Sequence, residues 1–299
     1  MFEDSRDYLR ENGLPADDAP ELPSSPKAFS DGGAYKWEAA GPLDATRAAQ
    51  LIADCERHGV FLNQITHTVG IMRLLDREIE ELVALAAETE RQLVLAVGPR
   101  STYDISAQRL ASGAAAHASA YRLRGVEQVL RAVADVERAV ALGVRGFLVF
   151  DEGLLWLLAR MRIEGRLPET IRFKASSGMG IANPFHCRAI ADLGADTINL
   201  QRDLTVGMMA AARQIVDIPF DVHTDNPAST GGFIRVYEAP EVVRVGAPVY
   251  LKAGSSLLEL DDDVLTERQV TAIAREIAVQ AETITRFLPA VPQSVSRDL

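Results

Sequence analysis

Short apolar runs alternate with longer amphipathic stretches along most of the chain. Runs of roughly four to eight residues rich in Val, Ile, Leu and Phe are typical of buried parallel strands, whereas apolar residues three and four positions apart indicate helices. Eight runs fit the first description: 35–39, 60–65, 92–98, 146–150, 171–176, 197–201, 219–224 and 248–254. The pattern therefore predicts eight strands separated by helical segments.

Four helical stretches can be bounded from the same pattern. They cover about 44–57, 76–90, 125–142 and 266–287. Asp44 can cap the first of them with its carboxylate. The third places a set of valines on one face: Val126, Val129, Val133, Val136 and Val140. Strands that alternate with helices predict a parallel sheet with helices outside it.

Eight strand–helix units within one large domain predict a (β/α)8 barrel, a TIM-type barrel, over residues 35–290. Residues 1–34 are rich in Pro, Asp, Ser and Gly, so we expect an N-terminal arm or lid segment, and 291–299 form a C-terminal tail. A doubly wound open sheet is the alternative. No GxGxxG sequence follows the first strand, which disfavours the open sheet. For the same reason, we expect no nucleotide cofactor.

Charge and composition limit the classes of partner, cofactor and cellular location that can be expected. The 299-residue chain carries a formal net charge of −11, which repels phosphate backbones, so nucleic acid is not expected as a partner. Two cysteines cannot hold a four-cysteine iron–sulfur cluster. The acidic N-terminus has no apolar signal segment, and no apolar run is long enough to span a bilayer. We expect a cytoplasmic protein without a membrane partner; whether it is a homo-oligomer is left open.

Polar residues gather where the predicted strands end, which is where barrel enzymes carry their catalytic groups. The candidates are Glu38, Arg100, Asp151, Lys174, Ser177, Asn199, Gln201, Arg202, Asp221, His223, Asp225, Lys252 and Ser255. Four of them are cations in an acidic protein, which favours a small anionic substrate. The alternative interpretation is a rim of mutually paired charges.

The segment Asp221-Val222-His223-Thr224-Asp225 is the most informative of these strand ends. Alternation places Asp221, His223 and Asp225 on one side of the strand. A carboxylate two residues from a histidine can orient it, raise its pKa or ligate a metal beside it. Acid–base chemistry centred on His223 is therefore predicted, with Asp221 as a partner. Glu38, Asp151, His223 and Asp225 could together bind Mn, Fe or Zn.

The two strand lysines support a second mechanism. Lys174 and Lys252 each follow a large apolar residue and precede an alanine, and the chain has only four lysines. A lysine in a barrel mouth can lose its proton and become a base or an imine-forming nucleophile. It can also stay charged and hold a substrate carboxylate, or pair with Glu38 or Asp151. Arg100, Asn199, Gln201, Arg202, Ser177 and Ser255 are the candidates for substrate binding.

The loop after the seventh strand, about 226–235, contains two successive glycines, Gly231 and Gly232. Their backbone freedom predicts a loop that closes over the ligand. A fixed turn is the alternative.

Residues 183–235 carry a family resemblance. The resemblance lies in Asn183 and in four segments, 193–196 (LGAD), 199–205 (NLQRDLT), 218–223 (IPFDVH) and 230–232 (TGG). It resembles the collagenase-like peptidase family, peptidase family U-32. The resemblance implies a TIM-like barrel and singles out Arg202 and His223. Asp203 stands where the family has Glu, Thr224 where it has Gly, and the family's cysteines near this turn are absent, so the iron–sulfur roles of some relatives are not expected.

Together, these features predict a TIM-barrel enzyme resembling the U-32 peptidases. We expect a hydrolase or acid–base lyase that acts on a small anion at the barrel mouth, with or without a divalent metal. A Schiff-base lysine lyase or aldolase is one alternative, and a non-catalytic partner subunit is the other.

Overall fold

All eight apolar runs form strands in the computed structural model, which describes residues 3–18, 22–98, 121–226, 232–257 and 264–298. The strands are β1 Tyr35–Gly41, β2 Leu62–His67, β3 Gln92–Ala96, β4 Gly146–Val149, β5 Arg172–Ala175, β6 Thr197–Asn199, β7 Phe220–His223 and β8 Val249–Ala253. Each strand pairs in parallel with the next, and β8 pairs with β1, so the barrel closes. The predicted (β/α)8 fold is confirmed.

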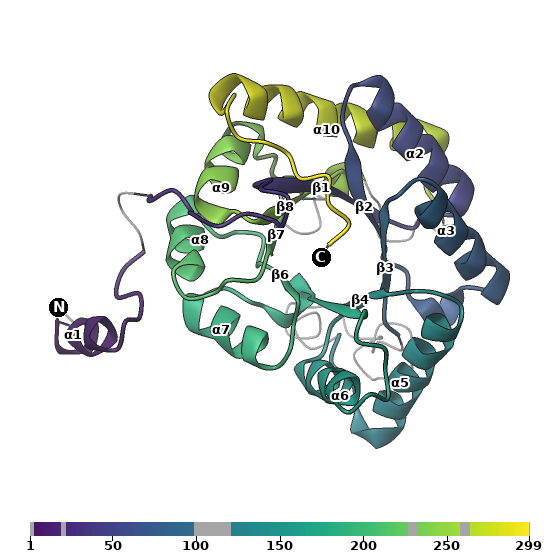
Figure 1. Cartoon of the computed structure of the whole chain (residues 1–299), viewed down its shortest axis with the longest axis horizontal. Coiled ribbons are helices and arrows are strands. Elements are labelled where there is room, and N and C mark those ends of the chain that lie inside the picture. Colours follow the sequence, from purple (N-terminus) through teal and green to yellow (C-terminus); the bar gives the residue numbers. More distant parts are fainter. Residues whose placement is uncertain (1–2, 19–21, 99–120, 227–231, 258–263, 299) are drawn as a thin grey trace.

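Helices surround the barrel as an outer ring (Figure 1). The described helices are α1 Glu3–Glu11, α2 Ala45–Arg57, α3 Asp76–Glu88, α5 Gly125–Ala141, α6 Glu152–Ile163, α7 Pro184–Asp192, α8 Val206–Arg213, α9 Ala239–Gly246 and α10 Glu267–Phe287. As predicted, Asp44 caps α2 by accepting a hydrogen bond from the Arg47 amide. None of these helices, within the residues described, is both long and apolar enough to cross a membrane.

Predicted and observed bounds differ by one or two residues at most strand ends. The second strand begins at Leu62 instead of Val60 and runs on to His67. In α5 the predicted valine face is wrong at its first position, because Val126 is 70% exposed, whereas Val136 is buried. A side chain in the first turn of this helix extends beyond the edge of the core.

Alternation along the strands separates two layers of side chains. Outward-facing residues such as Trp37, Phe173 and Phe220 pack beneath the helices and belong to the main hydrophobic core. The inward-facing residues differ around the barrel. On β3 and β4 most of them are apolar, and Val94, Ala96 and Leu148 form a small separate cluster with Phe150, which follows β4. The exception is Gln92 at the start of β3, which accepts a hydrogen bond from the Tyr250 hydroxyl. On β1, β5, β7 and β8 they are charged and polar, and this half carries the candidate site.

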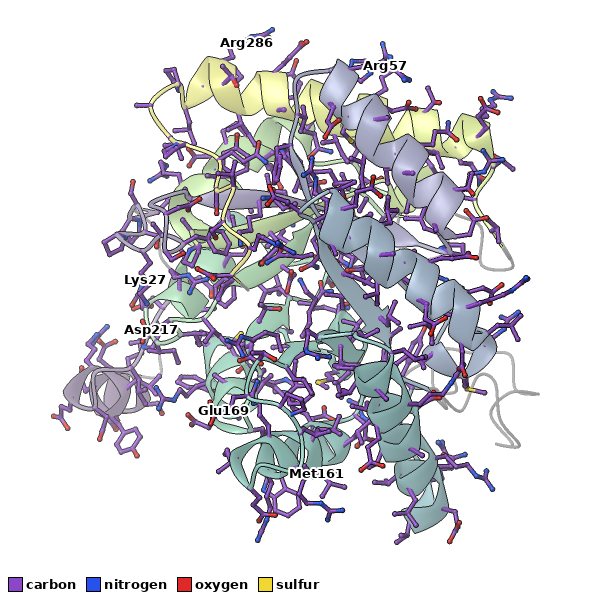
Figure 2. All side chains as sticks on the ribbon, turned by 45° about the vertical axis from the view of Figure 1, so that its right-hand side comes forward. Lys27, Arg57, Met161, Glu169, Asp217 and Arg286 are labelled. Atoms are coloured by element: carbon purple, nitrogen blue, oxygen red, sulfur yellow. The ribbon has the colours of Figure 1, made fainter. Side chains whose placement is uncertain are left out.

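Arm residues 22–34 and the C-terminal tail lie at the amino-terminal end of the barrel, whereas α1 lies apart from it (Figure 1). The backbone carbonyl of Pro292 accepts a hydrogen bond from the Ala34 amide at 2.9 Å. Lys27 in the arm is paired with Asp217 at 2.5 Å, and Figure 2 shows the two side by side. The tail ends over the middle of the barrel (Figure 1), where the buried Lys36 donates to the Asp298 carbonyl. Arm residues 22–34 therefore lie opposite the strand ends that carry the site.

Candidate functional site

Four charged side chains meet inside the barrel and are almost completely buried: Glu38, Lys174, Asp221 and Lys252. The Lys174 ammonium lies 2.9 Å from Glu38 Oε2 and also contacts Asp221 Oδ1. The Lys252 ammonium lies 2.8 Å from the other Glu38 oxygen. Strands β1, β5, β7 and β8 thus contribute one residue each to a charge-balanced group, called here the interior tetrad. Buried charges are tolerated only when they are paired in this way.

The pKa values of the two carboxyl groups in the tetrad are shifted in opposite directions. Burial alone raises the pKa of Glu38, but Lys174 and Lys252 outweigh it and the pKa is lowered. For Asp221, burial is the largest effect and raises its pKa to about 6, although Lys174 opposes it. Burial lowers the pKa of Lys174, but Asp221 and Glu38 reverse the shift and raise it. At neutral pH Glu38 is therefore firmly ionised, Lys174 is protonated, and Asp221 is the group nearest to titration.

Hydroxyl groups complete the hydrogen bonding of the carboxylates. Thr66 donates to Glu38 at 2.8 Å, and Thr197 donates to Asp221 at 2.7 Å. The Lys174 ammonium also lies 4.1 Å from the centre of the Tyr250 ring. These residues were not among the sequence candidates. Alternation could have identified Tyr250, since it stands two positions before Lys252 on the same strand and so faces the same side.

His223 lies on the inner face of β7, two residues beyond Asp221, and is 4% exposed. It is the register neighbour of Lys252 on β8. Burial lowers its pKa well below the usual value, and Lys252 and Arg202 lower it further. Its Nδ1 lies 3.3 Å from the Ser255 hydroxyl. The imidazole is therefore neutral, with one ring nitrogen engaged by Ser255.

Asp225 holds the turn that carries Ser255, the partner of His223. It accepts hydrogen bonds from the Ser255 amide at 3.1 Å and from the Ser256 amide at 2.8 Å. The Ser256 hydroxyl is a third donor, at 2.5 Å. Asp225 thus fixes the turn after β8, and that turn holds Ser255 against His223. Ser255 was predicted to bind substrate, and the structure places it as the partner of the histidine.

Two predicted substrate-binding residues present unsatisfied polar atoms. Asn199 is 1% exposed at the end of β6, and its Oδ1 has no hydrogen-bond partner among the described residues. Arg202 has a buried Nε that likewise lacks a partner there. Burial lowers the pKa of Arg202, partly offset by Tyr121 and Asp225. A buried donor or acceptor without a partner costs roughly 1–3 kcal/mol, so such atoms are expected where a ligand completes the site.

The predicted metal ligands do not come together. Glu38 is paired with the two lysines, and Asp225 is held by the β8 turn. Asp151 caps α6 by accepting from the Leu154 amide at 2.9 Å, a role that its position before a helical run could have revealed. Within the described part of the chain, no group of three or more His, Cys, Asp or Glu side chains is placed to hold a metal ion. The structure therefore does not gather Glu38, Asp151, His223 and Asp225 into one ligand cluster.

Two of the remaining candidates follow strands at the same end of the barrel as the tetrad. Ser177 is the first residue of a short 3-10 helix after β5. Gln201 follows β6, and its backbone N–H donates to the Ile181 carbonyl at 2.8 Å. Arg100 lies outside the described residues. Of the two pairings considered as the alternative for the lysines, the one with Glu38 is observed and the one with Asp151 is not seen among the described residues. A raised pKa keeps Lys174 protonated, which disfavours imine formation at this residue.

The loop after β7 is closed at its base. The Asn226 amide donates to the Phe233 carbonyl at 2.9 Å, and the Arg235 amide donates to the Thr224 carbonyl at 2.7 Å. Beside this base a pocket of about 650 Å³ is lined by residues 233–238 together with Arg202 and Asp203. Residues 227–231, on which the predicted closure depends, lie outside the described residues. The base of the loop itself is a fixed turn.

Comparisons with known proteins concern the fold alone. No protein-family profile matches the chain, and no curated protein matches it. The solved structure of the U32 peptidase Mk0906 is 16% identical, covers 75% of this chain and 95% of its own, and has a TM-score of 0.45. The YdjI aldolase from Escherichia coli K12 is 13% identical, with 84% and 91% covered and a TM-score of 0.49. For 3-hexulose-6-phosphate synthase the values are 16%, 82%, 99% and 0.44.

Proposed function

We propose that this chain is an acid–base enzyme that binds a small anionic substrate at the carboxyl-terminal end of the barrel, with His223 as the proton acceptor. The observation that carries the proposal is a buried neutral histidine beside two cations, Lys252 and Arg202, which lower its pKa. A neutral imidazole at physiological pH is the form that accepts a proton.

An anionic substrate explains why the cations are there. Protonating His223 adds a positive charge next to Lys252 and Arg202, which is unfavourable in the unliganded protein. A bound carboxylate or phosphate would offset this charge and raise the pKa of His223 toward the working pH. The substrate would thereby turn a poor base into an effective one. Arg202 also offers its buried Nε as a hydrogen-bond donor to that anion.

The direction of proton transfer follows from the contacts of the imidazole. In the tautomer that donates from Nδ1 to the Ser255 hydroxyl, Nε2 carries the lone pair. Asp225 holds the Ser255 backbone and so keeps the ring oriented. Nε2 would take a proton from a substrate carbon or from an attacking water. The first outcome is a lyase reaction and the second is hydrolysis.

A thermal-shift screen of phosphorylated and carboxylated metabolites, with and without divalent metal ions, tests the proposal. We expect at least one anion to raise the melting temperature, because binding only to the folded state stabilises it. The Arg202→Ala variant should lose that stabilisation. Arg286→Ala is the matched control, since Arg286 is an exposed arginine in the last turn of α10, at the edge of the molecule (Figure 2).

Two outcomes would contradict the proposal. If no anion or metal stabilises the protein, a non-catalytic partner subunit becomes the better interpretation. If turnover of a bound anion persists in His223→Asn, proton transfer does not depend on this residue. Borohydride trapping of a substrate adduct on Lys252 would instead establish the imine mechanism, and inactivation by EDTA would establish a metal requirement.

A further inference from the structure

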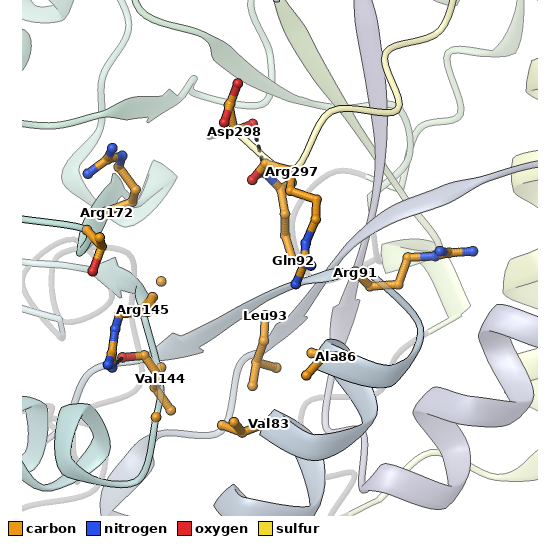
Figure 3. Close-up of a pocket in the computed structure, with 14 residues that line it drawn as sticks. Val83, Ala86, Arg91, Gln92, Leu93, Val144, Arg145, Arg172, Arg297 and Asp298 are labelled. Carbon is orange, nitrogen blue, oxygen red and sulfur yellow. Dashed lines mark hydrogen bonds between the residues drawn. The ribbon is translucent and has the colours of Figure 1, made fainter. Parts of the chain in front are cut away.

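A second pocket lies at the amino-terminal end of the barrel, where β3, β4 and β5 begin (Figure 3). Its volume is about 360 Å³, which is within the range of roughly 300–1,000 Å³ seen for small-molecule sites. The walls come from the end of α3, the starts of β3, β4 and β5, and the C-terminal tail. None of its lining residues belongs to the site described above.

Three arginines around this pocket have no acidic partner among the described residues. Arg145 and Arg172 approach from one side and Arg297 from the other (Figure 3). Arg145 and Arg172 each use Nη1 to donate to two backbone carbonyls, so their remaining N–H groups carry no hydrogen bond to a described residue. The Arg297 side chain donates no hydrogen bond within the described chain. Three arginines without acidic partners among the described residues, lining one pocket of a protein of net charge −11, point to an anion.

The other charged lining residues are already engaged. Arg91 is directed away from the pocket (Figure 3) and pairs with Glu56 at 2.7 Å. The Asp298 carboxylate accepts a hydrogen bond from the Ser30 hydroxyl at 2.5 Å. The Asp298 carboxylate keeps its charge, but one negative charge does not balance three guanidinium groups. The pocket therefore has a surplus of positive charge that its own walls do not balance.

The wall between the arginines is apolar, formed by Val83, Ala86, Leu93 and Val144. A ligand that fits both features carries a compact anionic group and a small apolar group. A phosphate monoester has about −1.5 to −2 charges at neutral pH and several acceptor oxygens, which matches three guanidinium groups better than a single carboxylate does. We propose that this pocket, formed by Arg145, Arg172 and Arg297 over an apolar wall, binds a phosphate monoester with a short apolar substituent.

Calorimetric titration with phenyl phosphate tests the proposal. The Arg202→Ala protein is used as the background, so that any binding at the other end of the barrel is weakened. We expect one binding site there, and at least about tenfold weaker binding when Arg172→Ala and Arg297→Ala are added, because charge-assisted hydrogen bonds are lost. Arg297→Ala alone removes no hydrogen bond of the fold and should still weaken binding. Arg286→Ala on the same background should leave the affinity unchanged.

Two further probes test the two halves of the ligand. Phenol should not bind measurably, and inorganic phosphate should bind more weakly than phenyl phosphate. The proposed site would be overturned if the affinity for phenyl phosphate were unchanged both in the Arg172→Ala/Arg297→Ala variant and in Arg297→Ala alone, provided that their melting temperatures match that of the Arg202→Ala parent. Inorganic phosphate binding as tightly as phenyl phosphate would overturn the role of the apolar wall. These outcomes do not depend on whether His223 is a catalytic base.

Discussion

The two halves of the barrel interior solve the same packing problem with opposite chemistry. Beside β3 and β4 the inward cluster of Val94, Ala96, Leu148 and Phe150 excludes water and needs no partners. The neighbouring β5, together with β1, β7 and β8, fills the same kind of space with the interior tetrad. Apolar packing of similar volume is often as stable as a buried ion pair, or more so. The charged half is therefore better explained by what it does than by the stability it contributes.

The largest effect is expected from breaking the tetrad. Glu38→Gln keeps the shape and an acceptor for Thr66 but leaves Lys174 and Lys252 without their shared counter-charge. Removing one partner of a buried pair typically costs about 3–5 kcal/mol. Chemical denaturation should show a loss of that size in the free energy of unfolding. A loss below about 1 kcal/mol would mean that water already screens these charges.

A cavity in the apolar half should separate stability from function. Leu148 is 3% exposed, and Leu148→Ala should lower the free energy of unfolding by roughly 2–5 kcal/mol. The thermal shift produced by an anion from the metabolite screen should stay the same, because Leu148 is the register neighbour of Lys174 and not of His223, beside which the anion is proposed to bind. If the shift disappears instead, the two halves are coupled and the division drawn here is wrong.

The pKa of Asp221 gives the charged half a distinct pH signature. A carboxyl whose pKa is raised to about 6 in the folded protein favours folding while it is protonated. This contribution is complete below the unfolded pKa, near 4, and is lost as the pH rises toward 6. Its size is on the order of 1–3 kcal/mol. Unfolding measured from pH 4 to 7 should show that Asp221→Asn lacks this decline; parallel curves for variant and parent would contradict it.

The pKa shift of His223 should change the pH dependence of stability in the direction opposite to that of Asp221. Its pKa is lowered by burial and by Lys252 and Arg202, so the folded state favours the neutral ring. That contribution is present above the unfolded pKa, near 6.5, and falls by at most about 1.4 kcal/mol per pH unit below it. His223→Asn, which can still donate to Ser255, should be less sensitive to acid between pH 6.5 and 5. A resonance of the His223 ring that titrates near 6.5 in NMR spectra would contradict the lowered pKa.

The sequence predicts the barrel because each element depends on local pattern. The apolar runs and the Asp44 cap concern neighbouring residues, and the structure confirms them. The site depends on side chains that meet across the barrel, such as Lys174 and Asp221, and their contact is set by strand register. Asp151 and Asp225 had suitable chemistry for a metal, but backbone amides already occupy their oxygens. Sequence gives the donors and acceptors, whereas only the fold shows which of them are satisfied.

The closed base of the β7 loop separates two properties that evolution or an engineer could change independently. Hydrogen bonds from Asn226 to Phe233 and from Arg235 to Thr224 fix both ends of the loop, while Asp225 anchors the turn that supports His223. The entropy cost of lengthening a loop grows only slowly with its length. Residues 227–231 could therefore be exchanged or extended to alter ligand preference while the proton-accepting group keeps its position. The barrel would then serve as a scaffold with a replaceable specificity segment.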